Sequence, residues 1–213
     1  MSGAPNESPR ELRGLVPFEV AAVLVVAIAP WPDRLPVALP LLVAGTLSRW
    51  TRGRSWGALL EAGGGRATVS AAAGLIALVA ALLAGTPLAE ALTDRAVGWS
   101  AFPTVRGNPA QLLAAALVVV ALAIATELAL RGWIVERVLE LSPGPAVLPV
   151  LVGAFAEALI TPGDLTVRIG AGVFGLGLGW IYVAAGRSAT AAICARAAFG
   201  LGAVVLEALR VIG

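Results

Sequence analysis

The chain of 213 residues contains no histidine and only one cysteine. Histidine is the commonest metal ligand and proton shuttle, so its absence removes the usual donors of a metal site. One cysteine excludes both a disulfide framework and a thiolate metal cluster. Charge is also scarce, because 13% of residues are charged, all fifteen basic residues are arginine and the formal net charge is +2. Such a small excess makes no basic patch, so no nucleic-acid partner is expected.

Apolar residues take the place of the missing charge. They make up 59% of the chain, and the mean hydropathy is +0.90. Soluble domains have about 45–50% apolar and about 25% charged residues, so a water-soluble globule of this size would be unable to cover so much apolar surface. The composition excludes a disordered chain for the same reason. We therefore expect an integral membrane protein whose main partner is the lipid bilayer.

The apolar residues fall into seven stretches, which predict an all-α polytopic protein with about seven transmembrane helices. A polar tail over residues 1–14 precedes them, and residues 15–109 and 110–213 divide the rest into N-terminal helices and a C-terminal four-helix core. Six or eight spans remain possible, since three of the stretches are shorter than a bilayer needs. The stretches are 15–29, 35–48, 67–84, 110–126, 146–160, 167–185 and 189–209.

The arginines between these stretches predict the orientation. The loop 49–66 contains four arginines and one acidic residue, Glu61, and is therefore expected on the cytoplasmic side. Arg10 and Arg13 place the N-terminus on the same side, and alternation then places the C-terminus outside. The arginine-only, alanine-rich and glycine-rich composition suggests a bacterial source and hence the bacterial cytoplasmic membrane. Tryptophans near the ends of the stretches predict an aromatic belt at the membrane interface. These are Trp31, Trp50, Trp56, Trp99, Trp133 and Trp180.

Four charged residues within the apolar stretches are the candidate functional residues. Glu127 and Arg131 are four residues apart, which places them on one face of a helix that can run on to Glu140. Glu157 and Arg196 have no opposite charge at helical spacing in their own stretches. Ionisable groups inside a membrane are costly unless they are paired. We therefore expect Glu127, Arg131, Glu157 and Arg196 to form one polar cluster inside the bundle, with Arg196 paired to Glu127 or Glu157.

The sixth stretch carries glycines at helical spacing. Gly175 and Gly179 form a G-x-x-x-G pair, and Gly172 extends the same smooth face. Such a face allows two helix backbones to approach closely. The pattern predicts that this helix packs centrally among the last four spans. It does not indicate a nucleotide-binding loop, because no strand precedes it.

The last hundred residues resemble the CPBP family, which comprises CAAX proteases and related intramembrane metalloproteases. Its pattern is Glu-Glu-x-x-x-Arg-Gly, Phe-x-x-x-His, a glycine-rich helix ending in Gly-Trp-x-Tyr, and His-x-x-x-Asn/Asp. The resemblance covers about 110–205, with the motif spacing intact. The matching segments are Thr126–Gly132, Phe155–Leu159, Gly177–Tyr182, the turn Ala185–Ser188 and Arg196–Gly200.

The departures from the family pattern concern its catalytic site. The resemblance implies that the first glutamate and the two histidines build the site that activates a water, with zinc as the expected cofactor. Those positions here are Thr126, Leu159 and Arg196, and the accompanying Asn/Asp is Gly200. Glu127 and Arg131 are retained. Zinc needs about three N, S or O protein ligands, and the spans offer only Glu127, Glu157, Asp164 and Cys194.

We therefore expect a CPBP-like scaffold with no intact catalytic site, no metal and no cofactor. Its expected role is to bind or scaffold a membrane protein or peptide, with the oligomeric state left open. One alternative is an active intramembrane endopeptidase that uses an atypical carboxylate site such as Glu127 with Glu157. Another is a small transporter or channel component, although no inverted internal repeat is evident in the sequence.

Overall fold

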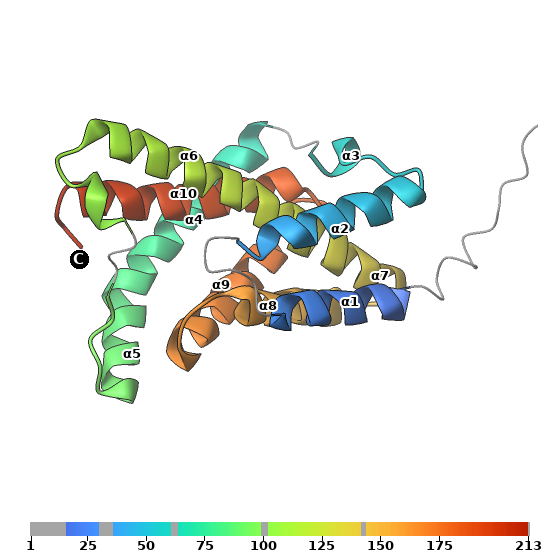
Figure 1. The fold of residues 1–213 in the computed structure, drawn as a ribbon, viewed down its shortest axis with the longest axis horizontal. Coiled ribbons are helices and arrows are strands. Elements are labelled where there is room, and N and C mark those ends of the chain that lie inside the picture. Colours follow the sequence, from blue (N-terminus) through green and yellow to red (C-terminus); the bar gives the residue numbers. More distant parts are fainter. Residues whose placement is uncertain (1–15, 30–35, 61–63, 99–101, 142–143, 213) are drawn as a thin grey trace, which may run out of the picture.

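The computed structural model describes residues 16–29, 36–60, 64–98, 102–141 and 144–212, and the regular elements within them are all helices (Figure 1). This confirms the predicted all-α fold. The predicted polar tail lies outside the described residues. The helices are α1 (Val16–Ile28), α2 (Ala38–Thr51), α3 (Gly57–Leu60), α4 (Gly64–Ala80), α5 (Thr86–Thr93), α6 (Pro109–Glu127), α7 (Glu136–Leu141), α8 (Val147–Ile160), α9 (Leu165–Ala184) and α10 (Ala189–Ala208).

Four helical segments in the described part are long and apolar enough to cross a membrane. They are Gly65–Thr93, Pro109–Leu141, Leu165–Ala184 and Ala189–Ala208. The first two are continuous through π-helical segments, η2 (Ala81–Gly85) and η4 (Leu128–Val135). The other three predicted stretches form the shorter helices α1, α2 and α8, so a total of seven spans stays a prediction. Large exposed apolar side chains along these segments fit the expected contact with lipid.

The ends of two spanning helices follow from local sequence. Asn108 caps α6, since its side chain accepts a hydrogen bond from the Gln111 amide at 3.2 Å, and Pro109 follows in the first turn. Asp164 caps α9 by accepting from the Val167 amide at 3.0 Å. The far end of α9 closes at Gly186, whose φ of +75° is a left-handed conformation that favours glycine. These local signals mark where α6 begins and where α9 begins and ends.

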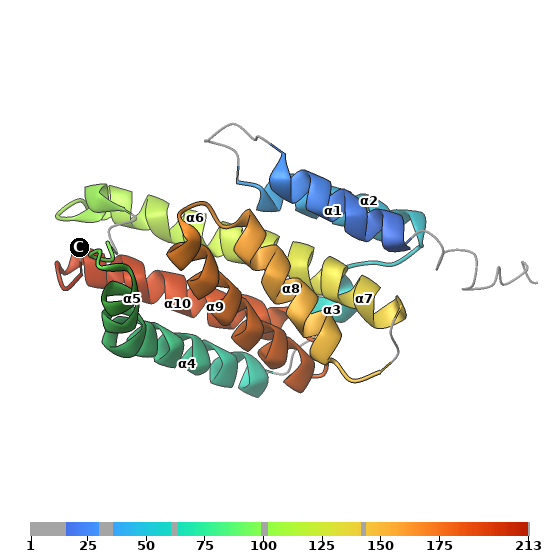
Figure 2. The same cartoon turned by 90° about the horizontal axis from the view of Figure 1, so that it is seen from below.

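The helices form one bundle with two shorter helices along its side. In Figure 2, α1 and α2 lie together beside the α6–α7 helix, and α4 lies at the opposite side next to α10. The predicted core of the last four spans is present, and α4 joins it. Gly74 of α4 faces the backbone of α10 so closely that a Cβ there would lie 2.0 Å from the Ala195 carbonyl oxygen. No side chain larger than hydrogen fits at this contact.

The glycine face of α9 packs against α8. A Cβ at Gly175 would lie 3.1 Å from Cα of Ala154, and a Cβ at Gly179 would lie 2.8 Å from Cγ1 of Val150. The predicted close helix approach is therefore present, and Gly172 faces the same helix at ordinary contact distance. The predicted central position of α9 is wrong. The helix in contact with α4, α6 and α9 is α10, because small residues on both of its flanks admit neighbours on more than one side.

The predicted aromatic belt is wrong for Trp133. This side chain is only 3% exposed and packs in a core with Leu41 and Leu130. Gly45 of α2 provides the space, since a Cβ there would lie 3.1 Å from the Trp133 ring. Trp50 and Trp180 are exposed, whereas Trp56 is partly buried. The predictions for Trp31 and Trp99 fall outside the described residues.

Candidate functional site

The four predicted charges meet in one cluster between α8, α10 and the long helix that runs from Pro109 to Leu141. We call Glu127, Arg131, Glu157 and Arg196 the four-charge cluster. The Nη1 atom of Arg131 donates to Oε2 of Glu157 at 2.6 Å and to Oε1 of Glu127 at 3.3 Å. Arg196 donates through Nε to Oε1 of Glu127 at 2.5 Å and through Nη2 to Oε1 of Glu157. The expected pairing of Arg196 is thus present with both carboxylates.

Burial makes this pairing necessary. Glu127 and Arg131 are 0% exposed, Glu157 is 3% exposed, and the Arg196 side chain is 20% exposed. A buried charge without a partner costs several kcal/mol, so each member depends on the others. With two carboxylates and two guanidinium groups the formal charge of the cluster is zero. The charges of the cluster therefore balance, although Oε2 of Glu127 lies 3.3 Å from Nε of Arg131 in an ion pair without a hydrogen bond.

The backbone that carries Arg131 departs from a regular α-helix. The segment η4, which contains Arg131, is π-helical rather than α-helical, and such segments occur often at functional sites. Arg131 also donates through Nη2 to the carbonyl oxygen of Gly175 in α9 at 2.7 Å. Gly175 allows this contact, because a Cβ there would lie 3.2 Å from Oε2 of Glu157. The glycine predicted for helix packing therefore also shapes the charged cluster.

Phe174 is a neighbour of the cluster that the sequence analysis missed. Its ring lies 5.4 Å from the guanidinium carbon of Arg196, within cation–π range, and it packs against the Phe199 ring in a tilted arrangement with 4.6 Å between centroids. No local signal marks Phe174, because an aromatic residue on a membrane helix is ordinary. Only the approach of α9 to α10 identifies it.

The remaining family positions surround the cluster without adding donors to it. Thr126 is 8% exposed and precedes Glu127 in α6, and Leu159 is partly buried near the end of α8. Gly200 faces α6, where a Cβ would lie 2.6 Å from Cγ1 of Val119. Leucine and glycine offer no side-chain donor, and arginine remains protonated. The residues at these positions do not fit a zinc site, because the Arg196 guanidinium is paired with the carboxylates of both Glu127 and Glu157.

The other candidate ligands lie apart from the cluster. Asp164 is exposed and caps α9, and Cys194 is a free cysteine of intermediate burial in α10. Among the residues that the structure describes, no three His, Cys, Asp or Glu side chains are grouped so as to hold a metal ion. The predicted candidates are therefore not brought together as a ligand set in that part of the chain.

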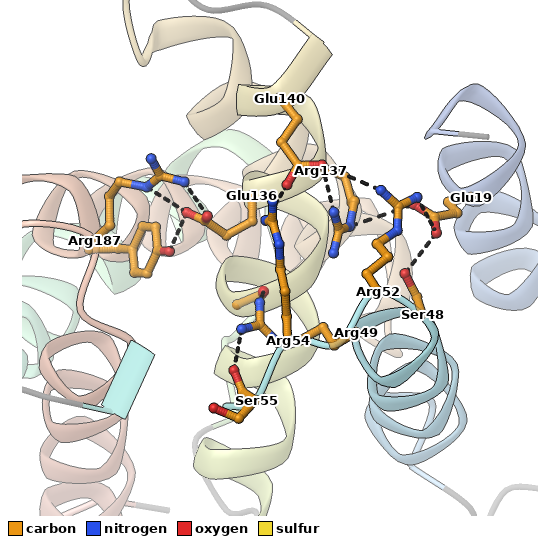
Figure 3. A network of polar contacts seen from close by, with 12 residues as sticks. Glu19, Ser48, Arg49, Arg52, Arg54, Ser55, Glu136, Arg137, Glu140 and Arg187 are labelled. Atoms are coloured by element: carbon orange, nitrogen blue, oxygen red, sulfur yellow. Dashed lines mark hydrogen bonds and ion pairs between the residues drawn. The ribbon is translucent and has the colours of Figure 1, made fainter. Parts of the chain in front are cut away.

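A second polar network lies at one end of the bundle and was not predicted (Figure 3). It joins α1, α2 and α7 to the turn after α9, and we call it the arginine-rich network. Arg137 donates to Glu140 at 2.6 Å, Arg54 donates to the same carboxylate at 2.5 Å, and Arg52 donates to Glu19 at 2.9 Å. The charged members are Glu19, Arg49, Arg52, Arg54, Glu136, Arg137, Glu140 and Arg187. Arginines predicted only to set orientation thus also connect helices.

Two motifs of the CPBP resemblance meet at Glu136 in this network. Tyr182, from the Gly-Trp-x-Tyr motif, donates its hydroxyl to Oε1 of Glu136 at 2.5 Å. Arg187, from the turn after α9, donates to both oxygens of the same carboxylate. The hydrogen bonds to Glu136 raise the pKa of Arg187. Glu136 therefore joins α7 both to the last turns of α9 and to the turn that follows it.

The comparison with known families agrees with this geometry. Residues 108–201 match the family described as type II CAAX prenyl endopeptidase Rce1-like. The match begins at the cap of α6, ends in α10 and includes every member of the four-charge cluster. No curated protein and no solved structure matches the chain significantly. The four long apolar helices and this similarity together indicate an integral membrane protein, whose residues 108–201 are similar to the Rce1-like family and consistent with the CPBP resemblance.

Proposed function

We propose that this protein is a catalytically inactive CPBP-family homologue that binds a membrane protein or peptide through the scaffold of the former catalytic centre. One observation carries the proposal. Arg196 stands where the resemblance expects a histidine, and its guanidinium donates to both Glu127 and Glu157. A general base needs a carboxylate free to accept a proton from water. Both carboxylates are instead held by two guanidinium groups.

The same pairing argues against the alternative of an active enzyme with an atypical carboxylate site. Ionised carboxylates that accept hydrogen bonds from arginine are weak bases, because pairing favours the charged form. Removing Arg196 from Glu157 to free this base would leave a buried charge without its partner. The retained glycine contacts and the π-helical segment support a preserved shape. A scaffold that keeps its shape while both of its carboxylates are paired with arginine is better suited to binding a membrane protein or peptide than to catalysis.

Metal analysis of the purified full-length protein tests the inactive centre. We expect no stoichiometric zinc and no chelator-sensitive proteolysis. A variant with Thr126→Glu, Leu159→His and Arg196→His restores the first glutamate and both histidines of the family pattern and serves as the positive control for metal loading. Near one zinc per chain in the natural sequence, or chelator-sensitive proteolysis abolished by Glu127→Ala, would contradict the proposal.

Site-specific crosslinking tests the binding role. A photoreactive amino acid at Leu159, the partly buried family position beside the cluster, is expected to give a discrete adduct with a membrane protein or peptide in cells. The matched control is the same amino acid at Leu92, which is 77% exposed in α5. Equal adducts from both positions, or none from Leu159, would count against a specific binding site at the former centre.

A further inference from the structure

A pocket of about 400 Å³ opens beside the arginine-rich network, at the opposite end of α9 from Asp164. Its lining includes Arg49, Arg54, Glu136 and Arg187, together with Ser55. This volume lies within the range of about 300–1,000 Å³ that is usual for small-ligand sites. The pocket shares no residue with the four-charge cluster, so it is a separate feature of the fold.

The pocket has an excess of positive charge. Among the residues that the structure describes, three guanidinium groups line it, against one carboxylate, Glu136. In the described part of the chain, the surrounding network (Figure 3) does not supply the balance, because it contains five arginines and three glutamates. Arg54 and Arg187 each have about half of the side chain exposed, at 53% and 51%. Their remaining N–H groups are therefore available to a ligand.

Arg49 provides the strongest indication of a missing anion. The residue is 5% exposed, and no carboxylate of the described residues lies within ion-pair distance of it. Its guanidinium donates to the backbone oxygens of Gly132 and Ser55 and lies over the Trp56 ring, while its Nε has no hydrogen-bond partner. Burial and the neighbouring Arg137 lower its pKa. An anion in the pocket would stabilise this buried cation, in addition to the longer-range attraction of Glu136.

The position of the pocket makes a lipid headgroup one source of the anion. Gly186 and Arg187 directly follow the end of α9, and Glu136 lies in the last two turns of the span Pro109–Leu141. The pocket therefore opens where membrane-spanning helices end, at the level of lipid headgroups. Basic pockets between transmembrane helices bind anionic headgroups, and arginine is suited to phosphate because its N–H groups match two phosphate oxygens at once.

We propose that this pocket binds a phosphate group, carried by the headgroup of an anionic phospholipid or by soluble phosphate. Arg49 supplies the buried charge, and Arg54 and Arg187 supply the exposed N–H groups. Glu136 orients Arg187 through its two hydrogen bonds. Phosphate bound here compensates the excess charge and joins the α2–α3 loop to the turn after α9.

The test uses the purified full-length protein and two probes. Native mass spectrometry in detergent measures retention of phosphatidylglycerol against diacylglycerol with the same acyl chains, which lacks the phosphate. Inorganic phosphate is titrated while thermal unfolding is followed. Arg54→Gln is the main variant, since Glu140 keeps its 2.6 Å hydrogen bond from Arg137 and the network stays paired. Arg168→Gln, an exposed arginine near the opposite end of α9, is the matched control.

We expect phosphatidylglycerol to bind and diacylglycerol not to bind. Arg54→Gln should weaken binding about tenfold, the effect of losing one charge-assisted hydrogen bond, and Arg49→Gln should weaken it further. Arg168→Gln should leave it unchanged.

If Arg49→Gln does not fold, Arg54→Gln decides the question alone. Stabilisation by inorganic phosphate without lipid retention supports the site and assigns a soluble source. Binding of neither probe, an unaffected Arg54→Gln variant, or an equal loss in Arg168→Gln would overturn the proposal.

Discussion

Arg196→Gln is the substitution that tests the four-charge cluster most directly. It removes the guanidinium that donates to both Glu127 and Glu157 and leaves Arg131 as the cation facing two carboxylates. The formal charge of the cluster then changes from zero to minus one at a site where both carboxylates are at most 3% exposed. Glutamine keeps a polar amide on a shorter side chain, so the substitution removes the charge together with the outer part of the arginine side chain.

The expected cost follows from burial. Removing one partner of a buried ion pair costs about 3–5 kcal/mol. The Arg196 side chain is 20% exposed, which admits some solvent and places the effect near the lower end, at about 3 kcal/mol. For a chain of this size each kcal/mol shifts the unfolding midpoint by roughly 2–4 °C. The midpoint should therefore fall by roughly 6–12 °C.

Thermal unfolding of the full-length protein in detergent measures this shift, with Arg168→Gln as the exposed arginine control. Glu157→Gln and the double variant Arg196→Gln/Glu157→Gln complete a double-mutant cycle. The double variant restores a neutral cluster. Its loss of stability should therefore be smaller than the sum of the two single losses by at least about 1 kcal/mol. An Arg196→Gln variant within about 0.5 kcal/mol of the natural sequence, or effects that add within that margin, would refute the pairing argument.

Three further predictions concern other parts of the fold. Gly175→Leu should cost about 1–3 kcal/mol of stability because it is overpacked against α8, whereas Gly177→Leu, which faces open space on the same helix, should cost little; equal effects would refute the packing argument. Tyr182→Phe should cost about 1.5–3 kcal/mol in thermal unfolding, since it loses a buried hydrogen bond to a charged group, and a stability unchanged within 0.5 kcal/mol would contradict this. In a Cys194→Ala background, Ser55→Cys should resist a membrane-impermeant thiol reagent in intact cells and react after permeabilisation; labelling from outside would reverse the predicted orientation.

Local sequence signals predicted much of the helical framework. The hydropathy pattern located the long spans, because a helix that faces lipid must be apolar over about 20 residues. Asn108 and Asp164 cap α6 and α9 by accepting from amides three residues away, a local signal that the sequence analysis did not use. The close approach at Gly175 and Gly179 also follows from residue spacing along one helix. The identity of the helix that they pack against, α8, does not follow from this spacing.

The residues of the candidate site were found because charge inside an apolar stretch is conspicuous. Glu127 and Arg131 could be paired in advance, since four residues is one helical turn. Glu157 and Arg196 were expected in the same cluster only because isolated charges in a membrane need partners. The role of Gly175 as the acceptor for Arg131 could not be predicted, because a backbone carbonyl has no sequence signature. The arginine-rich network was missed because arginines in loops are equally well explained by orientation.

By itself, the sequence determined that this is a helical membrane protein, where its main helices lie and which charges must be satisfied inside it. These are local properties, set by hydropathy and by the spacing of 3.6 residues per turn. The tertiary structure decided that Arg196 meets Glu157 across 39 residues, that α10 rather than α9 occupies the centre, and that Glu136 holds both Tyr182 and Arg187. The physical reason is that contacts between helices depend on their relative rotation and distance. Both depend on how side chains from distant parts of the chain pack together.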